Sequence, residues 1–183
     1  MKLTPVGLPG MYLVEATWRG DERGRFGKLF SRPVLAEHGL DFDLVDINMS
    51  QTPIDGTIRG LHYQIAPHEE TKIFSCATGA FLDVCVDLRP GSASYGEWYG
   101  HELRPDQSAL WIPPGIAHGF QTLVPDTTAI YASSAAWAPD AERGVRWNDP
   151  ALGIDWPLEP GDTLSAKDRV WPDIELNSGG SQP

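Results

Sequence analysis

The chain has 183 residues, a formal net charge of −11, and 41% hydrophobic and 21% charged residues. These proportions are ordinary for a globular protein, and the length suffices for one domain with a real core. The acidic balance argues against a nucleic-acid-binding surface, which needs a basic face, but it is compatible with a local basic pocket for an anionic small ligand.

Two cysteines, Cys76 and Cys85, lie inside apolar runs. A disulfide framework would need more of them, so we expect buried, reduced thiols. Pro5, Gly7 and Pro9 interrupt the N-terminal residues, which lack the apolar run of a signal peptide, and no stretch is long enough to span a bilayer. We therefore expect a cytoplasmic protein with no membrane partner.

Strand-like segments dominate the chain, and helical periodicity is scarce. One helix is expected over Ser31–Gly39, with Pro33 in its first turn and the glycine as its stop. Strands are expected over Val45–Ser50, Lys72–Ala77, Ala80–Leu88, Gly96–Leu103, Ser108–Ile112, His118–Leu123 and Ala129–Ala135. The Thr78–Gly79 pair predicts a β-hairpin between the second and third of these strands. Short strands at this spacing are typical of a β-sandwich or a small barrel.

The sequence after Pro139 is loop-like, because four further prolines interrupt any regular element. No internal repeat, heptad pattern or linker divides the chain. We therefore predict a single domain over residues 1–175 and a disordered tail over residues 176–183.

The run Gly56–Gln64 carries the most informative chemistry. It contains His62, and a histidine can take and return protons near neutral pH. It also contains Arg59, whose guanidinium can hold a phosphate with two parallel hydrogen bonds. Together they predict proton-transfer chemistry on a phosphorylated small molecule.

Two motifs resemble those of the jelly-roll barrels called cupins. Gly56, His62 and Glu69 match the first motif, and Pro113–His118 matches the second. The resemblance implies an all-β jelly-roll barrel of two antiparallel sheets with few short helices.

The metal site of many cupins is not expected in this chain. Gln64 stands where the first motif has its second histidine, so an amide replaces a strong ligand. Lys72 nearby would also repel a cation. We expect no bound metal.

Further stretches follow one another in the order of a single cupin family: Asp21–Phe26, Asn48–Ser50, Arg59–Gln64, Lys72, Asp83–Arg89, Trp111–Phe120, Trp147–Pro150 and Ser165–Asp168. They resemble the nucleotide-sugar epimerases typified by dTDP-4-dehydrorhamnose 3,5-epimerase. The resemblance implies an isomerase that removes a proton next to the C4 ketone of a nucleotide-linked 4-keto-6-deoxyhexose. An enolate forms, and a proton returns on the other face. No cofactor is implied, because the ketone accepts the electron pair.

The resemblance also assigns four catalytic roles. His62 is the base, and Asp168 holds its far nitrogen. Lys72 stabilises the enolate oxygen, and Tyr131 returns the proton. Taken singly, each side chain has an ordinary explanation. His62 could be a histidine with satisfied hydrogen bonds, and Asp168 a solvated carboxylate in a loop. Lys72 could be a charge at a strand edge, and Tyr131 a core aromatic. Together they fill the roles of one mechanism.

Phosphate binding is assigned to Arg59 and Arg23, with Lys167 and His118. In the family, Arg23 and Phe26 reach the nucleotide from the neighbouring subunit. This implies a homodimer with exchanged N-terminal strands. The ordinary explanation for Arg23 is a charge in a β-turn.

Three positions depart from the family pattern. Lys28 replaces a glutamate, and Asp46, two residues before the substrate-binding Asn48, replaces a glutamine. Lysine only donates and an ionised aspartate only accepts, which would suit cytosine better than thymine and suggests a CDP-linked substrate. Trp137 replaces a second tyrosine near the sugar, so we expect altered control over whether C3, C5 or both are epimerised.

Other functions stay open at this point. Within the fold, a 4-keto to 3-keto sugar isomerase would use related chemistry but move the carbonyl. A non-catalytic sugar-binding cupin would bind without isotope exchange, and a metal-dependent oxygenase would contain a metal ion. The favoured function is epimerisation in the synthesis of a deoxysugar for a polysaccharide or a natural product.

Overall fold

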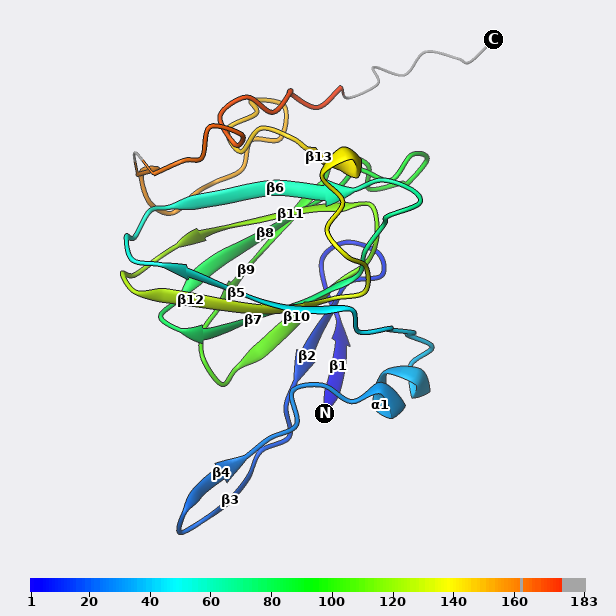
Figure 1. Cartoon of the computed structure of the whole chain (residues 1–183), viewed down its shortest axis with the longest axis vertical. Helices are drawn as coiled ribbons and strands as arrows, with labels where there is room; N and C mark the ends of the chain where they lie inside the picture. The colour runs from blue at the N-terminus through cyan, green and yellow to red at the C-terminus, as the bar shows by residue number, and fades with distance from the viewer. Residues whose placement is uncertain (162, 176–183) are drawn as a thin grey trace.

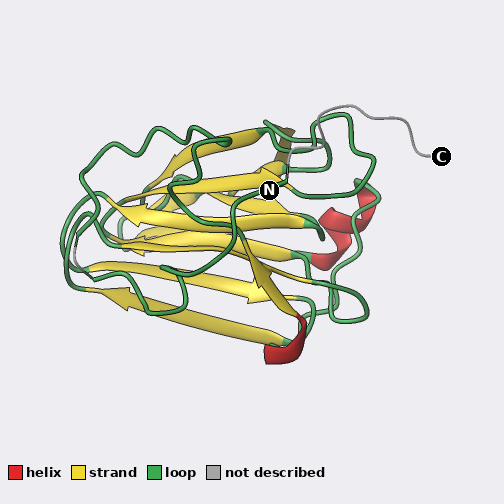
Figure 2. Cartoon of the chain, turned by 90° about the horizontal axis from the view of Figure 1, so that it is seen from above, coloured by secondary structure: helices red, strands yellow, loops and turns green. Residues whose placement is uncertain are grey.

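Two antiparallel sheets form the body of the protein in a computed structural model that describes residues 1–161 and 163–175. Six strands make one sheet, in the order β1 (Lys2–Pro5), β2 (Tyr12–Glu15), β10 (Ser108–Ile112), β7 (Lys72–Thr78), β12 (Thr127–Ser133) and β5 (Asp46–Thr52). Five make the other, in the order β13 (Glu142–Gly144), β6 (Ile58–Gln64), β11 (Ile116–Thr122), β8 (Phe81–Asp87) and β9 (Trp98–Leu103). The sheets face each other (Figure 1), and the layers are seen from above in Figure 2. This is the predicted jelly-roll β-barrel.

An aromatic cluster joins the two sheets inside the barrel. Phe74 comes from the six-stranded sheet, whereas Phe81 and Phe120 come from the five-stranded sheet. Their ring centroids lie 5.0–5.6 Å apart, and all three side chains are buried. Such aromatic contacts add to the free energy gained by removing the rings from water.

Each sheet is also covered on its outer face. Helix α1 (Arg32–Glu37) and the residues after it place Leu35 and Phe42 against the six-stranded sheet. The segment that follows β13 covers the five-stranded sheet with Val145, Leu152 and Ile174. In Figure 1 this segment, coloured orange to red, lies over β6. Val145, Leu152 and Ile174 thereby hold this segment beside the strand that carries the most informative motif.

The helix and all of the predicted strands are confirmed, with small shifts at their ends. Strand β6 was not predicted as a strand, although it carries the Arg59–Gln64 motif. The loop-like segment after Pro139 contains the short strand β13. Two exposed strands, β3 (Arg19–Asp21) and β4 (Gly24–Phe26), form a hairpin that projects away from the barrel (Figure 1).

The predicted hairpin at Thr78–Gly79 is wrong. Strand β7 pairs with β10 and β12, whereas β8 pairs with β9 and β11 in the opposite sheet. Gly79, at φ +77°, turns the chain from one sheet into the other. A tight glycine turn fits both geometries, and local sequence does not say which partners the strands choose.

The predicted tail, residues 176–183, lies outside the described residues. Among the residues that are described, no helix is long and apolar enough to cross a membrane.

Strand β5 has an inverted polarity pattern that matters for the site. Its apolar residues Ile47 and Met49 are 67% and 63% exposed, whereas Asp46, Asn48 and Ser50 are half-buried. Because side chains alternate between the two faces of a strand, the polar set faces the inside of the barrel. The barrel therefore has a polar inner wall at this edge.

We expect Gly79→Ala to be more destabilising than Gly91→Ala, which has the same φ of +77°. An added Cβ at position 79 would lie 2.3 Å from Thr127 Oγ1, whereas at position 91 it would meet no atom within 4 Å. Both variants lose about 1–2 kcal/mol, because alanine is strained at a positive φ. Overpacking adds a loss of roughly 1–3 kcal/mol at position 79 alone. Urea denaturation of both variants measures the difference; equal losses would contradict the close approach.

Candidate active site

His62 and Asp168 form the central pair of the site. The Nε2 atom of His62, on β6, lies 2.5 Å from Oδ1 of Asp168. Asp168 is only 3% exposed, and its Oδ2 also accepts a hydrogen bond from the Gly60 backbone N–H. Burial alone would raise the pKa of the Asp168 carboxyl, but the hydrogen bond and the charge of His62 hold that pKa below its ordinary value.

This pair decides which nitrogen of His62 can act as a base. Because Asp168 is ionised, Nε2 carries the proton that is donated to it. In the neutral imidazole, Nδ1 is then the nitrogen with a free lone pair. That nitrogen lies 4.0 Å from Oε1 of Glu142, whose carboxylate accepts hydrogen bonds from Lys167 Nζ at 2.8 Å. Nδ1 of His62 therefore lies beside the ion pair of Glu142 and Lys167, whose charges offset each other.

Tyr131 lies on the opposite sheet, on β12. Its ring stacks on Phe74 with centroids 5.0 Å apart. Burial raises the pKa of the Tyr131 hydroxyl, and the charge of Glu70 raises it further. Arg59 lowers this pKa, and Asp46 again raises it. The hydroxyl is therefore protonated at neutral pH and can donate a proton.

Lys72 supplies a positive charge at the same site. Its Nζ lies 3.0 Å from Glu70 Oε1, and both side chains are largely buried, at 14% and 12% exposure. Buried lysines need such a partner, because transfer of an unpaired charge from water is costly. The pairing fixes the ammonium group on the wall of the cavity.

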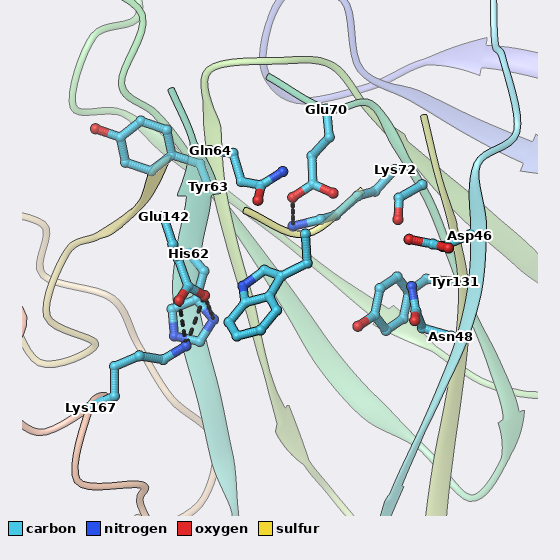
Figure 3. A pocket seen from close by; sticks show the side chains of 12 residues that line it. Asp46, Asn48, His62, Tyr63, Gln64, Glu70, Lys72, Tyr131, Glu142 and Lys167 are labelled. Atoms are coloured by element: carbon cyan, nitrogen blue, oxygen red, sulfur yellow. Dashed lines mark hydrogen bonds and ion pairs between the residues drawn. The ribbon is translucent and has the colours of Figure 1, made fainter. Parts of the chain in front are cut away.

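Except for Asp168, these side chains line one cavity of about 400 Å³ between the two sheets. His62 and Glu142 come from one wall, and Asp46, Asn48, Lys72 and Tyr131 from the other (Figure 3). Trp137, 66% exposed, lines the same cavity. A neighbouring cavity of about 330 Å³ shares His62, Lys72, Tyr131 and Lys167 and adds Arg59, His118 and Asp168. The volume is sufficient for a small polar ligand.

His118 belongs to a second buried histidine–carboxylate pair. Its Nε2 lies 2.7 Å from Oδ2 of Asp83, and the two side chains are 6% and 0% exposed. Arg59, in the same cavity, donates from Nε to Thr52 Oγ1 at 3.1 Å. Of the side chains predicted to contact phosphate, all but Arg23 thus line the same cavity as His62 and Tyr131.

Three predicted substrate contacts do not line this cavity. Arg23 lies at the tip of the projecting hairpin, where it pairs with Asp21 at 2.6 Å, and the neighbouring Phe26 is 72% exposed. Lys28, two residues further on, is also exposed. Asp46 instead lines the larger cavity together with His62 and Tyr131, whereas Lys28 lines neither of the two cavities.

Gln64 explains why the second cupin histidine is dispensable here. Its Nε2 donates to the carbonyl oxygens of His68 and Ala136, at 2.9 and 3.3 Å, while its Oε1 accepts from the Ala138 N–H at 2.6 Å. A neutral histidine offers one donor and one acceptor, whereas the amide uses two donors and one acceptor at once. Gln64 therefore holds the loop that carries Trp137. Within the described residues, no group of three or more His, Cys, Asp or Glu side chains could hold a metal ion.

Sequence reasoning missed Glu70 and Glu142. Glu70 stands two residues before Lys72, so the alternation of an extended chain could have placed both on one side. Glu142 had no such signal, because its segment was interpreted as a loop.

Comparisons with known proteins show the family of the chain. The family model described as dTDP-4-dehydrorhamnose 3,5-epimerase matches residues 5–175. A dTDP-4-dehydrorhamnose 3,5-epimerase from Sinorhizobium fredii is 42% identical over 156 residues, which are 85% of this chain and 80% of that protein.

Two solved structures share the fold closely. The crystal structure of dTDP-4-dehydrorhamnose 3,5-epimerase from Bacillus anthracis, with TDP and PPi bound, has a TM-score of 0.90 and 38% identity, and covers 94% of this chain and 99% of that one. A 3′-monoepimerase from Streptomyces bikiniensis in complex with dTDP-quinovose has a TM-score of 0.86 and 32% identity, and covers 92% of this chain and 86% of that one.

Fold and site together define a jelly-roll protein in which a histidine–carboxylate pair faces a phenol and an ammonium group across a polar cavity. The chain belongs to the dTDP-4-dehydrorhamnose 3,5-epimerase family.

We expect Asp168→Asn to lower the free energy of unfolding at pH 7 by about 1–3 kcal/mol, because the buried hydrogen-bond network loses its charge. The pKa of Asp168 is lower in the folded state than in the unfolded state, so its contribution is complete above the unfolded pKa. It is lost as the pH falls below about 4 and through the folded pKa. The difference between wild type and variant should therefore shrink on acidification.

Chemical denaturation between pH 3 and pH 7 measures this difference. Asp155→Asn, at an exposed position, is the matched control and should change stability by less than about 0.5 kcal/mol. A difference that stays constant down to pH 3 would contradict the lowered pKa.

Proposed function

We propose that this protein is an epimerase of a nucleotide-linked 4-keto-6-deoxyhexose, inverting C3, C5 or both, and that residues 1–175 form its single domain. The observation that carries the proposal is the placement of His62 Nδ1 and Tyr131 on opposite walls of one cavity. Inversion of a carbon needs a base on one face and an acid on the other. The names of the relatives support a dTDP-linked substrate.

The proposed reaction begins with proton removal. Nδ1 of His62 takes the proton from the carbon next to the C4 ketone, and the electron pair moves onto the C4 oxygen. Asp168 stabilises the imidazolium that results, and the Lys72 ammonium stabilises the negative oxygen. No cofactor is needed, since the ketone accepts the electron pair.

Protonation from the opposite face completes the inversion. The Tyr131 hydroxyl donates its proton to the same carbon, and the C4 carbonyl re-forms. A raised pKa suits this role, since the phenol enters the reaction protonated. Proton exchange with solvent then restores the tyrosine and the histidine.

The nucleotide is proposed to lie beyond the sugar. Arg59, Lys167 and His118 would contact the diphosphate, and the side-chain amide of Asn48 would add a hydrogen bond. Arg59 is suited to this task, because its fork can bind two phosphate oxygens.

We further propose that a second copy of the chain supplies Arg23 and Phe26 by exchange of N-terminal strands in a homodimer. The hairpin projects from its own barrel (Figure 1), and apolar side chains near it are exposed, including Phe26 at 72%, Leu29 at 64% and Ile47 at 67%. Exposed apolar surface of this kind is typical of an interface.

We also propose that the protein is located in the cytoplasm. Its two cysteines, Cys76 and Cys85, are buried and free, as is usual in that reducing compartment.

We expect His62→Asn to slow deuterium incorporation from D2O into a dTDP-linked 4-keto-6-deoxyhexose by about 10²–10⁴-fold, because the base is lost. Tyr131→Phe should behave differently. His62 can still remove and return the proton on one face, so deuterium enters while the yield of the inverted sugar falls. NMR of the products measures both quantities, and titration with dTDP controls for binding.

The same spectra separate the alternatives. Two labelled carbons indicate action at C3 and C5, and a single one supports the expectation that Trp137 restricts the reaction. A shifted carbonyl identifies the ketoisomerase. Binding without any labelling identifies the non-catalytic cupin. Near-normal exchange by His62→Asn would remove His62 from the mechanism.

A mixed-dimer experiment tests the exchange of strands. Arg23→Ala and His62→Asn should each be strongly impaired alone. In a 1:1 mixture about half of the dimers contain both variants, and each of these has one intact site, so activity should reach about one quarter of the wild-type value. No recovery on mixing would show that Arg23 acts within its own protomer or not at all.

A further inference from the structure

Asp46 occupies an unusual place in the cavity. In the register of the six-stranded sheet, Ser133 of β12 lies opposite Asp46 on one side and opposite Lys72 on the other. The three residues therefore form one row across β5, β12 and β7. With strands about 4.8 Å apart, the backbones of Asp46 and Lys72 are about 10 Å apart across the cavity wall.

The next row along these strands contains the proton donor. Asn48, Tyr131 and Phe74 are paired two residues further along, which places this row about 6.6 Å from the first. The negative charge of Asp46 also reaches the hydroxyl of Tyr131, whose pKa it helps to raise. Asp46 is thus a neighbour of the reacting groups and belongs to the sugar part of the cavity.

The charge of Asp46 is the one in this cavity that no direct partner offsets. Glu70 is paired with Lys72, and Glu142 with Lys167. In the part of the chain that the structure describes, the Asp46 carboxylate makes no hydrogen bond and no ion pair, although it is half-buried and lines the cavity. When a ligand displaces water from the cavity, an uncompensated carboxylate becomes costly unless the ligand offers it a donor.

The hexose is the part of the substrate that can meet this requirement. If the C4 oxygen of the hexose contacts Lys72, the sugar ring extends along the row from Lys72 toward Asp46 on β5. The hydrogen-bond donors that can then reach Asp46 are the substituents of C2 and C3. The diphosphate carries negative charge and offers no donor, so it is repelled from this position.

We propose that Asp46 is a specificity-determining residue that accepts a hydrogen bond from a hydroxyl or amino group on C2 or C3 of the hexose. This inference rests on the proposed function, because the sugar is oriented by its C4 oxygen on Lys72. It predicts that sugars lacking the donor are rejected, since their binding leaves the carboxylate desolvated and unpaired.

Binding, not turnover, is the primary measurement. The ligands are dTDP-6-deoxyglucose, which has a C4 hydroxyl and cannot react, its 2-deoxy and 3-deoxy analogues, and a 3-amino analogue. Wild-type protein should bind one of the two deoxy analogues about 10–100-fold more weakly than the parent, as expected for a hydrogen bond to a charged group. The 3-amino analogue should retain tight binding if the donor is on C3.

Asp46→Ala should reduce this discrimination to less than about threefold, mainly because the deoxy analogue no longer leaves a carboxylate unpaired and therefore binds more tightly. Asp46→Asn keeps an acceptor without the charge and should be intermediate. Asp55→Asn, in the exposed turn after β5, changes the net charge by the same amount and should preserve the discrimination.

CDP-6-deoxyglucose is included as a fifth ligand. Three results would overturn the inference: equal binding of the four dTDP-linked ligands by wild-type protein, an equal loss for every ligand in Asp46→Ala, or a change confined to the preference between CDP- and dTDP-linked sugars. The last result would mean that Asp46 contacts the nucleobase and not the sugar. Discrimination that depends on Asp46 in a protein without isotope exchange would retain the inference and reject the epimerase function. The two failures are therefore distinguishable.

Discussion

The hydrogen bond between His62 Nε2 and Asp168 is the interaction on which the site depends. It joins residues 106 positions apart and determines which imidazole nitrogen faces the cavity. A buried carboxylate is costly by itself, and the cost is offset by His62 and by the Gly60 N–H. The C-terminal segment can hold Asp168 there because Val145 and Ile174 anchor it to the outer face of the five-stranded sheet. Packing on the outer face of that sheet thereby positions the carboxylate that orients His62 on the inner face.

The barrel interior combines an apolar part with a polar part. Phe74, Phe81 and Phe120 join the sheets and supply the burial that a small β protein needs. Along β5 the pattern is reversed, so that Asp46 and Asn48 face inward. Stability and function are thus assigned to different stretches of the same walls, and Tyr131, which stacks on Phe74, lies where they meet.

Local sequence predicted the elements better than their partners. Proline and glycine marked α1, and alternation marked most of the strands, because both signals act within a few residues. The Thr78–Gly79 hairpin was wrong since partner choice depends on the whole barrel. Strand β6 escaped prediction because its inward side chains are polar, and its pattern lacks regular apolar alternation.

The same distinction applies to the site. The four residues of the expected mechanism, His62, Lys72, Tyr131 and Asp168, were named from motifs, and the structure brings them to adjoining cavities. Their ionic partners, Glu70 and Glu142, were not, because ion pairing depends on side-chain geometry and leaves little trace in a single sequence. Asp46 was predicted as a substrate contact at the nucleobase, yet strand register places it one row from Tyr131.

The polar groups of this barrel also explain how a cupin scaffold can serve proton transfer. His62 and His118 each use Nε2 to bond a buried carboxylate, and Gln64 uses its amide to hold a loop. Each of these hydrogen bonds orients its side chain, and at position 64 an amide stands where a related barrel has an imidazole. In the proposed reaction, the Lys72 ammonium provides positive charge where a negative oxygen develops, a task that a metal ion can perform elsewhere. A fixed lysine on a strand offers that charge without an open coordination position, so the cavity wall remains free to select the sugar.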